Sequence, residues 1–411
     1  MVDNQEKKII QYDLVIIGGG LVGTGLLLAL QHAGLRIALV DASAIHREDN
    51  RLFALNDSSC QFLANIGVWP LLMNEAEPIH AVQVSYAGRF GRVSLQREEL
   101  KLSSLGHVVP AQVIETAMQA SLQEMLLSNS RIVVYRPAVL QQLSQVGDTI
   151  NATIASEDGQ LFHLQTPLLI GADGTESTVR KQREIEAELI DYAQSAIVTR
   201  TILKRPHQQI AYERFCDRSA IAMLPLRDNT VATIWSGDHA LMTSLAALSD
   251  KQFLEALQSQ FGYRLGRLQH IAERYQFPLK MLRAKKIVDG GVLLMGNAAH
   301  TLHPIAAQGF NLAIFEVALF AESLLNKIKK GDTFTYADLA GLAAKMEHHQ
   351  SHILEMSHKL AVFFGKKSWK HVAVSAGMVG FDMLPPLKRK FMSAMLGRAG
   401  AVPSLLLSNS G

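Results

Sequence analysis

The chain contains little cysteine. Its two thiols, Cys60 and Cys216, are isolated from any Cys-x-x-Cys spacing, which argues against a disulfide framework and against a zinc site. We expect both to be small, buried, apolar side chains in a protein of the reducing cytoplasm. His300 and His303 have no cysteine or aspartate beside them to complete a ligand set, so no metal site is predicted.

A strong charge of one sign is also missing. The 40 basic and 37 acidic side chains leave a formal net charge of only +3. A balance this even gives no reason to expect nucleic acid as a partner. Binding of small molecules is the better expectation.

Long apolar runs are missing as well. Residues 1–11 are polar and charged, and they lack the apolar core of a signal peptide. The longest apolar helical stretch, residues 310–325, is interrupted by polar side chains, and no run reaches the roughly 18 apolar residues needed to cross a bilayer. The sequence therefore predicts a cytoplasmic protein without a membrane-spanning segment.

A strand, a glycine turn, a helix and a second strand open the chain. Residues 12–17 are continuously apolar, residues 21–33 have helical spacing, and residues 36–40 form another apolar run. This order within about 30 residues predicts a βαβ unit with parallel strands. Later patterns predict a β-meander over residues 131–164, further strands and a helix over residues 195–261, and a helical tail from residue 336.

The turn of the βαβ unit carries a phosphate-binding pattern. Its glycines have the spacing GxGxxG: Gly18, Gly20 and Gly23. Such glycines permit a tight turn, close approach of a pyrophosphate and close packing of helix on strand. The helix start at Leu21 and Val22 attracts the diphosphate, and Asp41 after the second strand can accept hydrogen bonds from an adenosine ribose. The unit predicts dinucleotide binding.

Two further signatures extend the pattern. Gly171-Ala172-Asp173-Gly174 is followed by Ser177 and Arg180, and residues 296–311 read GNAAHTLHPIAAQGFN. With the glycine turn, they resemble the aromatic-ring hydroxylase flavoproteins. The last signature is similar in particular to the ubiquinone-biosynthesis hydroxylases of the polyprenyl-methoxyphenol hydroxylase kind, and the resemblance covers nearly the whole chain.

The resemblance implies a para-hydroxybenzoate-hydroxylase-like α/β fold. A Rossmann-like FAD domain would comprise residues 1–75, 105–180 and 284–330. A mixed β-sheet substrate domain would be inserted as residues 76–104 and 181–283. Residues 331–411 would form a helical C-terminal region.

The resemblance also implies which residues contact FAD. Beyond the glycine turn, these are Arg51, Gln112, Asp173, Gly296, Asn297, Pro304, Ala307, Gly309, Phe310 and Asn311. Asn297 would hold the ribityl chain, since its carbonyl accepts from a hydroxyl. Residues 304–311 would wrap the isoalloxazine, with amides at the following helix start stabilising negative charge on the reduced ring. No catalytic side chain is assigned, because the flavin carries the chemistry.

The implied activity is hydroxylation of the ring of a polyprenylated phenol in ubiquinone biosynthesis, with NAD(P)H as co-substrate and O2 added at flavin C4a as a hydroperoxide. A non-oxygenating FAD oxidoreductase of an isoprenoid substrate is a first alternative, because a shared binding fold does not fix the reaction. A flavin-poor interaction subunit of a biosynthetic assembly is a second. This second alternative rests on Ala307, which stands where glycine is usual. Alanine there would strain the loop, and so weaken flavin binding, if the position needs a positive φ.

Some features have plain explanations beside functional ones. Ala313 and Glu316 stand where glycine and aspartate are usual, and alanine is the better helix former. Histidines 348, 349, 352 and 358 are expected on a solvated helix face. Basic residues near apolar stretches could contact an anionic membrane surface or belong to ordinary solvated helices: Lys366, Lys367, Lys370, Lys388, Arg389, Lys390 and Arg398.

Overall fold

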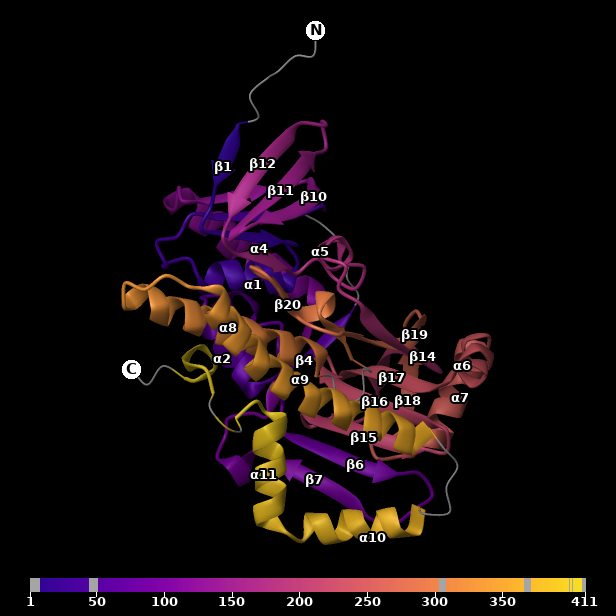
Figure 1. Cartoon of the computed structure of the whole chain (residues 1–411). Helices are drawn as coiled ribbons and strands as arrows, with labels where there is room; N and C mark the ends of the chain where they lie inside the picture. The colour runs from indigo at the N-terminus through magenta and orange to yellow at the C-terminus, as the bar shows by residue number, and fades with distance from the viewer. Residues whose placement is uncertain are drawn as a thin grey trace.

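The computed structural model describes residues 8–43, 51–302, 308–365, 371–398, 400 and 402–408, without the side chains of residues 352, 356–365 and 371–376. The mixed α/β architecture and the helical C-terminal region expected from the sequence are both present (Figure 1). Four sheets organise the described chain. Two of them, a six-stranded and a nine-stranded sheet, position the candidate site.

The six-stranded sheet is mostly parallel. Its order is β20 (Val288–Asp289), β21 (Val292–Leu294), β13 (Leu169–Gly171), β2 (Leu14–Ile17), β3 (Ile37–Val40) and β9 (Ile132–Tyr135), with only β20 antiparallel to its neighbour. β2 and β3 are buried at every position, because layers cover both faces of such a sheet. The helices that share its core include α1 (Leu21–Ala29), α4 (Ala111–Ser128) and α8 (Gly309–Lys329).

The meander predicted after residue 131 also packs against this core. Its antiparallel strands are β10 (Ala138–Val146), β11 (Thr149–Ser156) and β12 (Leu161–Thr166), and β1 (Ile9–Gln11) adds to β12 in parallel. Inward side chains such as Ile150 and Ile154 belong to the same apolar cluster as β2. The predicted meander is confirmed for these three strands, whereas its expected first strand, at residues 131–135, is β9 of the six-stranded parallel sheet.

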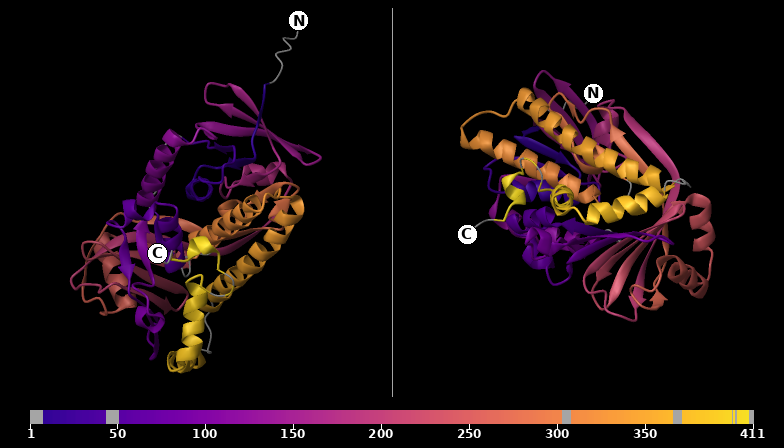
Figure 2. Two further views of the ribbon diagram at one scale, coloured as in Figure 1. Left: turned by 90° about the vertical axis from the view of Figure 1, so that its left-hand side faces the viewer. Right: turned by 90° about the horizontal axis from the view of Figure 1, so that it is seen from below.

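The nine-stranded sheet is built mainly from the middle of the chain. Its path is β22 (His300–Thr301), β19 (Tyr275–Ala284), β14 (Ala187–Leu203), β17 (Thr230–Asp238), β16 (Ser219–Leu226), β15 (Ile210–Cys216), β6 (Ala81–Tyr86) and β7 (Arg92–Gln96), and β18 (Leu268–Ile271) pairs with β14. One face packs on α6 (His239–Ala246) and α7 (Asp250–Phe261). The other meets the C-terminal helices (Figure 2).

The C-terminal helices are α9 (Tyr336–Gly365), α10 (His371–Asp382) and α11 (Pro385–Met395), followed by the short helix η4 (Ser404–Leu406). A small sheet of β4 (Leu52–Asn56), β8 (Gly106–Pro110) and β5 (Glu77–Ile79) lies between the two large sheets, since its residues occur in the apolar clusters of both. The short helices α2 (Asp57–Asn65), α3 (Trp69–Leu72) and α5 (Thr178–Gln182) complete the connections. The predicted domain boundaries stay a prediction.

Helix α8 corrects one expectation from the sequence. By length and composition it is apolar enough to cross a membrane, although no such run was expected. In the structure 56% of its most apolar window is buried inside the protein, where it packs against α1, α2 and α9. Packing inside the protein accounts for its apolar character.

Candidate functional site

In the glycine turn after β2, two of the three glycines leave no space for a side chain, and the third does. Gly18 has a φ of +110°, and a Cβ there would lie 2.3 Å from the Ala172 carbonyl oxygen. A Cβ at Gly23 would lie 1.9 Å from the Gly18 oxygen, whereas a Cβ at Gly20 would meet no atom within 4 Å in the part of the chain that the structure describes. Gly18 and Gly23 are therefore required by packing, and Gly20 faces open space at the start of α1.

The start of α1 lacks a side-chain cap. Its N-cap residue is Gly20, which has no side chain to accept a hydrogen bond from the first amides of the helix. The first amides of a helix have no partner within the helix and carry partial positive charge. An open, uncapped helix start next to a glycine without a Cβ fits a diphosphate.

Asp41 follows β3 beside the glycine turn, where a ribose acceptor was predicted. Its carboxylate also has a protein partner that the sequence did not reveal: Arg136, with Nη2 2.7 Å from Asp41 Oδ2. The same guanidinium donates to the Gly19 carbonyl at 3.0 Å and to Gln119 at 2.7 Å. Arg136 thus fixes both the acid and the turn, and no local motif could have identified it.

Asp173 is engaged in holding its own turn. Its Oδ1 accepts from the Ser177 hydroxyl at 2.5 Å, and its Oδ2 accepts from the amides of Thr178 and Val179 at 2.7 and 3.1 Å. These bonds satisfy the N-terminal amides of α5. The predicted contact of Asp173 with FAD stays a prediction.

The third signature is tied to α8 and α9 by Glu316, a buried acid on α8. Its carboxylate accepts from the Gly296 amide at 3.0 Å and from Gln350 at 2.8 Å, and it lies 2.5 Å from His300 Nε2. A buried carboxylate requires such partners. Glu316 therefore performs a definite structural task although aspartate is usual at this position. Asn297, in the same turn, is exposed.

The three signatures converge on one place. Gly18 packs on Ala172 of the second signature, and a Cβ at Gly296 would lie 3.0 Å from a methyl group of Val22. Arg180 of the second signature donates to the Ala298 carbonyl of the third at 2.8 Å. Segments far apart in the sequence thus form a single site at the ends of β2, β13 and β21.

The start of α8 is joined to β4 on another side of this site. Asn311 accepts from the Asn56 amide at 2.9 Å and from the Ser59 hydroxyl at 2.7 Å, and it donates to the Ala54 carbonyl at 3.0 Å. The rings of Phe310 and Phe53 are 4.7 Å apart. These contacts fix the first turn of α8, where Gly309 also lies.

Arg51 and Gln112 lie beside that junction. The Arg51 guanidinium is 5.5 Å from the Phe53 ring, and the Arg51 carbonyl accepts from the Ala111 amide at 2.9 Å. Gln112 follows Ala111 in the first turn of α4. Arg51 thus lies beside Phe53, whose ring contacts Phe310, and Gln112 is next in sequence to the residue that Arg51 binds. Pro304 and Ala307 lie outside the described residues, as does His303.

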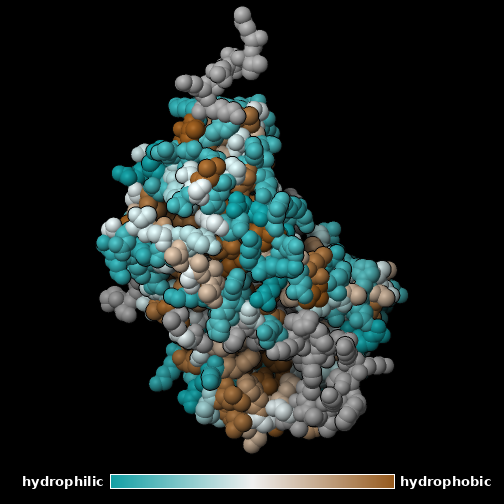
Figure 3. All heavy atoms as spheres, viewed as in Figure 1, coloured by the Kyte–Doolittle hydropathy of each residue, from teal (hydrophilic) through white to brown (hydrophobic). Residues whose placement is uncertain are grey.

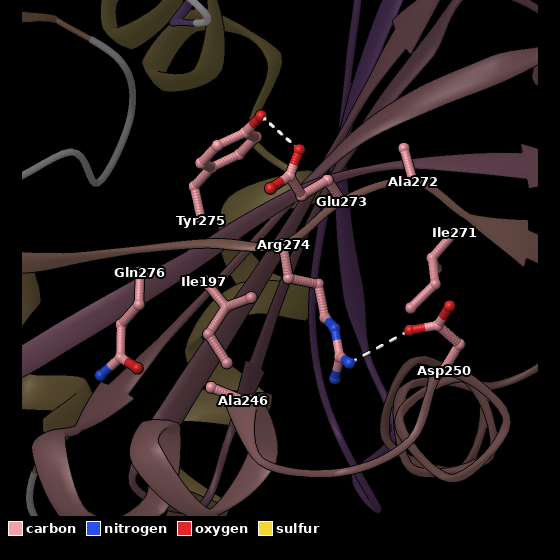
Figure 4. Close-up of a pocket in the computed structure, with 9 residues that line it drawn as sticks. All are labelled: Ile197, Ala246, Asp250, Ile271, Ala272, Glu273, Arg274, Tyr275 and Gln276. Atoms are coloured by element: carbon pink, nitrogen blue, oxygen red, sulfur yellow. Dashed lines mark hydrogen bonds and ion pairs between the residues drawn. The ribbon is translucent and has the colours of Figure 1, made fainter.

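A cavity of about 380 Å³ lies elsewhere, between β14, β18, β19 and helices α6 and α7 (Figure 4). Its cation, Arg274, pairs with Asp250 at 3.1 Å, donates to the Leu248 carbonyl at 2.7 Å and lies 5.0 Å from the Phe253 ring. Arg274 therefore connects α7 to the sheet. Of the predicted site residues that the structure describes, none lines this cavity.

The structure also describes the two cysteines and two of the histidines that were expected to have no role in the site. Cys60 and Cys216 are buried as predicted, and burial raises the pKa of each thiol. His349 is not on a solvated face: its ring stacks on Phe315 with centroids 3.8 Å apart, whereas His348 is exposed. Among the described residues no group of His, Cys, Asp and Glu could hold a metal.

Comparison with known proteins agrees with this geometry. The family model described as an FAD binding domain matches residues 11–334. The uncharacterized protein slr1300 of Synechocystis is 29% identical over 97% of this chain and 96% of its own length. The ubiquinone hydroxylase UbiL of Rhodospirillum rubrum is also 29% identical, over 96% of this chain and 92% of its own.

A solved structure shows the same fold. The p-nitrophenol 4-monooxygenase PnpA of Pseudomonas putida superposes with a TM-score of 0.76 over 96% of this chain and 100% of its own, at 15% identity. The similarity therefore extends from the glycine turn to the C-terminal helices.

Proposed function

Because the chain belongs to the FAD binding domain family, we propose that it is an FAD-dependent monooxygenase that hydroxylates the ring of a polyprenylated phenol in ubiquinone biosynthesis. The observation that carries the proposal is the convergence of three distant signatures on one open, uncapped helix start. The likeness to a ubiquinone hydroxylase over nearly the whole chain supports this substrate class. No observation favours a non-oxygenating oxidoreductase or an interaction subunit.

The residues of the site fit FAD. The open position at Gly20 and the first amides of α1, at Leu21 and Val22, would receive the diphosphate. Asp41, oriented by Arg136, would accept from the adenosine ribose. Arg51, Gln112, Asp173, Gly296 and Asn297 would contact the remainder of the cofactor.

The first turn of α8 would stabilise the ring. Its N-terminal amides, at Gly309 to Asn311, lie at the positive end of a 21-residue helix, which favours negative charge nearby. The bonds of Asn311 to β4 and α2 hold this helix end in place. When bound, the flavin supplies the oxygen chemistry and NAD(P)H, as is typical of the family, the electrons. The protein supplies position and electrostatics.

Oxygen incorporation tests this function. Purified protein loaded with FAD should oxidise NAD(P)H faster when a prenylated phenol is added, and labelled O2 should place one labelled oxygen in the product. A yellow protein whose product carries no label would establish the non-oxygenating alternative. A colourless protein that takes up no FAD would favour the interaction subunit.

We also propose peripheral contact with an anionic membrane through α11 and the turn before it. Exposed apolar side chains there include Met383 (74%), Leu384 (53%) and Leu387 (50%), and Arg389 and Lys390 are exposed beside them. Apolar and basic side chains together favour an anionic bilayer surface.

Two of the basic residues named from the sequence are otherwise occupied. Lys388 is buried and pairs with Glu99 and Asp382 at 3.0 and 3.2 Å, and Arg398 pairs with Asp57. Lys388 was expected to be available to a membrane or to solvent, and its burial and its two partners prevent this. Arg398 is exposed, as the solvated alternative expected, although it is paired with Asp57. Lys366, Lys367 and Lys370 lie outside the described residues.

Vesicle flotation measures the membrane contact. The double change Leu384→Ser and Leu387→Ser should weaken binding to vesicles of phosphatidylglycerol and phosphatidylcholine by about tenfold or more, since each leucine contributes about 1 kcal/mol when buried. Leu127→Ser, at an exposed position of α4, is the control and should change nothing. Equal flotation of the double variant and the wild type would contradict this contact.

A further inference from the structure

Glu213 is an acid in the middle of strand β15, on the sheet face that meets the C-terminal helices. Successive strand residues point to opposite faces. Tyr212 packs into the cluster formed with α6 and α7, whereas Ala211 packs into the cluster that contains Met392 of α11. The pairing of β15 with both neighbours is regular, so Glu213 shares the face of Ala211.

The surroundings of this carboxyl are apolar. Glu213 lies opposite Val84 of β6 and Ala222 of β16, and Ala222 in turn lies opposite Ile234 of β17. Phe215 follows on the same face of β15. Among the described residues none donates a hydrogen bond to the Glu213 carboxyl or pairs with it, and burial alone raises its pKa to about 7.

An acid held among apolar side chains without a partner lowers stability. Contact with a polar group of a ligand would account for an acid at such a position. Its raised pKa leaves it partly ionised near neutral pH, so it can accept a hydrogen bond there as a carboxylate.

The same sheet face is continuous with the predicted flavin side of the site. The apolar cluster around Ala211 also contains Leu52 and Ala54 of β4. Leu52 adjoins Arg51, and the Ala54 carbonyl accepts from Asn311 at the start of α8. Glu213 lies two residues along from Ala211, which is about 7 Å in a strand. Glu213 therefore lies on this sheet face, farther than Ala211 from the predicted position of the flavin ring.

The opposite end of this face is lined by α10 and α11. Met378 and Phe381 of α10 and Met392 of α11 belong to the same apolar cluster. Figure 3 shows hydrophobic side chains gathered around a recess at the lower end of the molecule, where Figure 1 places α10, α11, β6 and β7. A ligand with one polar group at Glu213 and an apolar remainder toward these helices would match the face.

We propose that Glu213 binds the phenol hydroxyl of the substrate, which donates a hydrogen bond to the carboxylate, while the prenyl chain lies on the apolar face toward α10 and α11. This rests on the proposed function for the class of substrate. It assigns a polar contact to a residue that none of the three signatures contains. Glu213 is a binding and orienting residue, and the hydroxyl it holds fixes which ring carbon faces the flavin.

Binding of two matched ligands tests the assignment. Geranylphenol and its methyl ether are titrated calorimetrically into the FAD-loaded wild type and Glu213→Gln. Loss of a charge-assisted hydrogen bond should weaken geranylphenol about tenfold in the variant. The methyl ether has no proton to donate, so its affinity should be the same in both proteins. Glu255→Gln, at an exposed position of α7 on the opposite face of the sheet, should match the wild type with both ligands.

Three outcomes would overturn the assignment: equal binding of geranylphenol by wild type and Glu213→Gln, an equal loss for the phenol and its ether, or no binding of geranylphenol by the wild type. The proposed function fails separately, since it depends on labelled oxygen in the product. A wild type that hydroxylates the phenol, together with a Glu213→Gln variant that binds it equally well, would reject the role of Glu213 alone. A ligand-specific loss without oxygen incorporation would retain the binding site and reject the monooxygenase.

Discussion

Gly20→Ala is expected to leave the fold intact and to weaken FAD binding roughly 100-fold, which is about 2.7 kcal/mol. A Cβ at Gly20 meets no atom of the described residues within 4 Å, so the substitution introduces no clash with them. The methyl group would instead occupy the space through which a diphosphate approaches the start of α1. The free energy of unfolding of the cofactor-free protein should therefore stay within about 0.5 kcal/mol of wild type.

Gly18→Ala should behave in the opposite way. At a φ of +110°, with a Cβ 2.3 Å from the Ala172 oxygen, alanine strains the backbone and forces two signatures apart. We expect a loss of about 3 kcal/mol or more in unfolding free energy. Urea unfolding without FAD and fluorescence titration with FAD separate the two effects.

Gly341→Ala is the control for both variants. Gly341 lies in α9, and an added Cβ there meets no atom of the described chain within 4 Å. Alanine in a helix should be neutral or stabilising by up to about 1 kcal/mol, with FAD affinity unchanged. Wild-type FAD affinity in Gly20→Ala would place the diphosphate elsewhere and remove the structural basis of the proposed site.

The local parts of the fold were predictable because short-range chemistry determines them. The glycine turn needs a positive φ at Gly18, and the helix over residues 250–261 begins with a capping box at Ser249 and Gln252. Strand β14 was predicted only from residue 195, yet it spans 17 residues from Ala187. Its first half is largely exposed and interrupted by a register shift, so it lacks the alternation that indicates a strand.

The pairings across the fold were not predictable. Arg136 meets Asp41 only after β9 has aligned with β3. In the sequence Lys388 resembled a membrane-facing cation, because nothing there shows its partners. Packing of α11 brings Glu99 and Asp382 to it. Glu213 has no motif around it, and it becomes conspicuous only when the strand register shows that its neighbours are apolar.

Glu213→Gln should stabilise the protein at pH 8. Burial raises the pKa of Glu213 from 4.5 to about 7. A carboxyl whose pKa is higher in the folded state contributes stability that is fully present below the unfolded pKa and is lost as pH rises through the folded pKa. The wild type therefore loses stability between about pH 4.5 and pH 8 through this group, by an amount on the order of 2 to 3 kcal/mol, and glutamine removes that loss.

The stability difference between Glu213→Gln and wild type isolates this contribution, because all other titrating groups are common to both. The other titratable groups near this sheet face have partners of their own: the Tyr86 hydroxyl donates a hydrogen bond to Asp217, and Lys388 of α11 pairs with Glu99. The free energy of unfolding, measured with urea, should be higher for Glu213→Gln than for the wild type at pH 8, and this difference should shrink toward pH 5. Glu255→Gln should have the same unfolding free energy as the wild type at both pH values. A variant less stable than wild type at both pH values would mean that the carboxyl has a structural partner. A variant that is more stable yet binds the phenol less well would show that the acid is retained for the ligand at the expense of the fold.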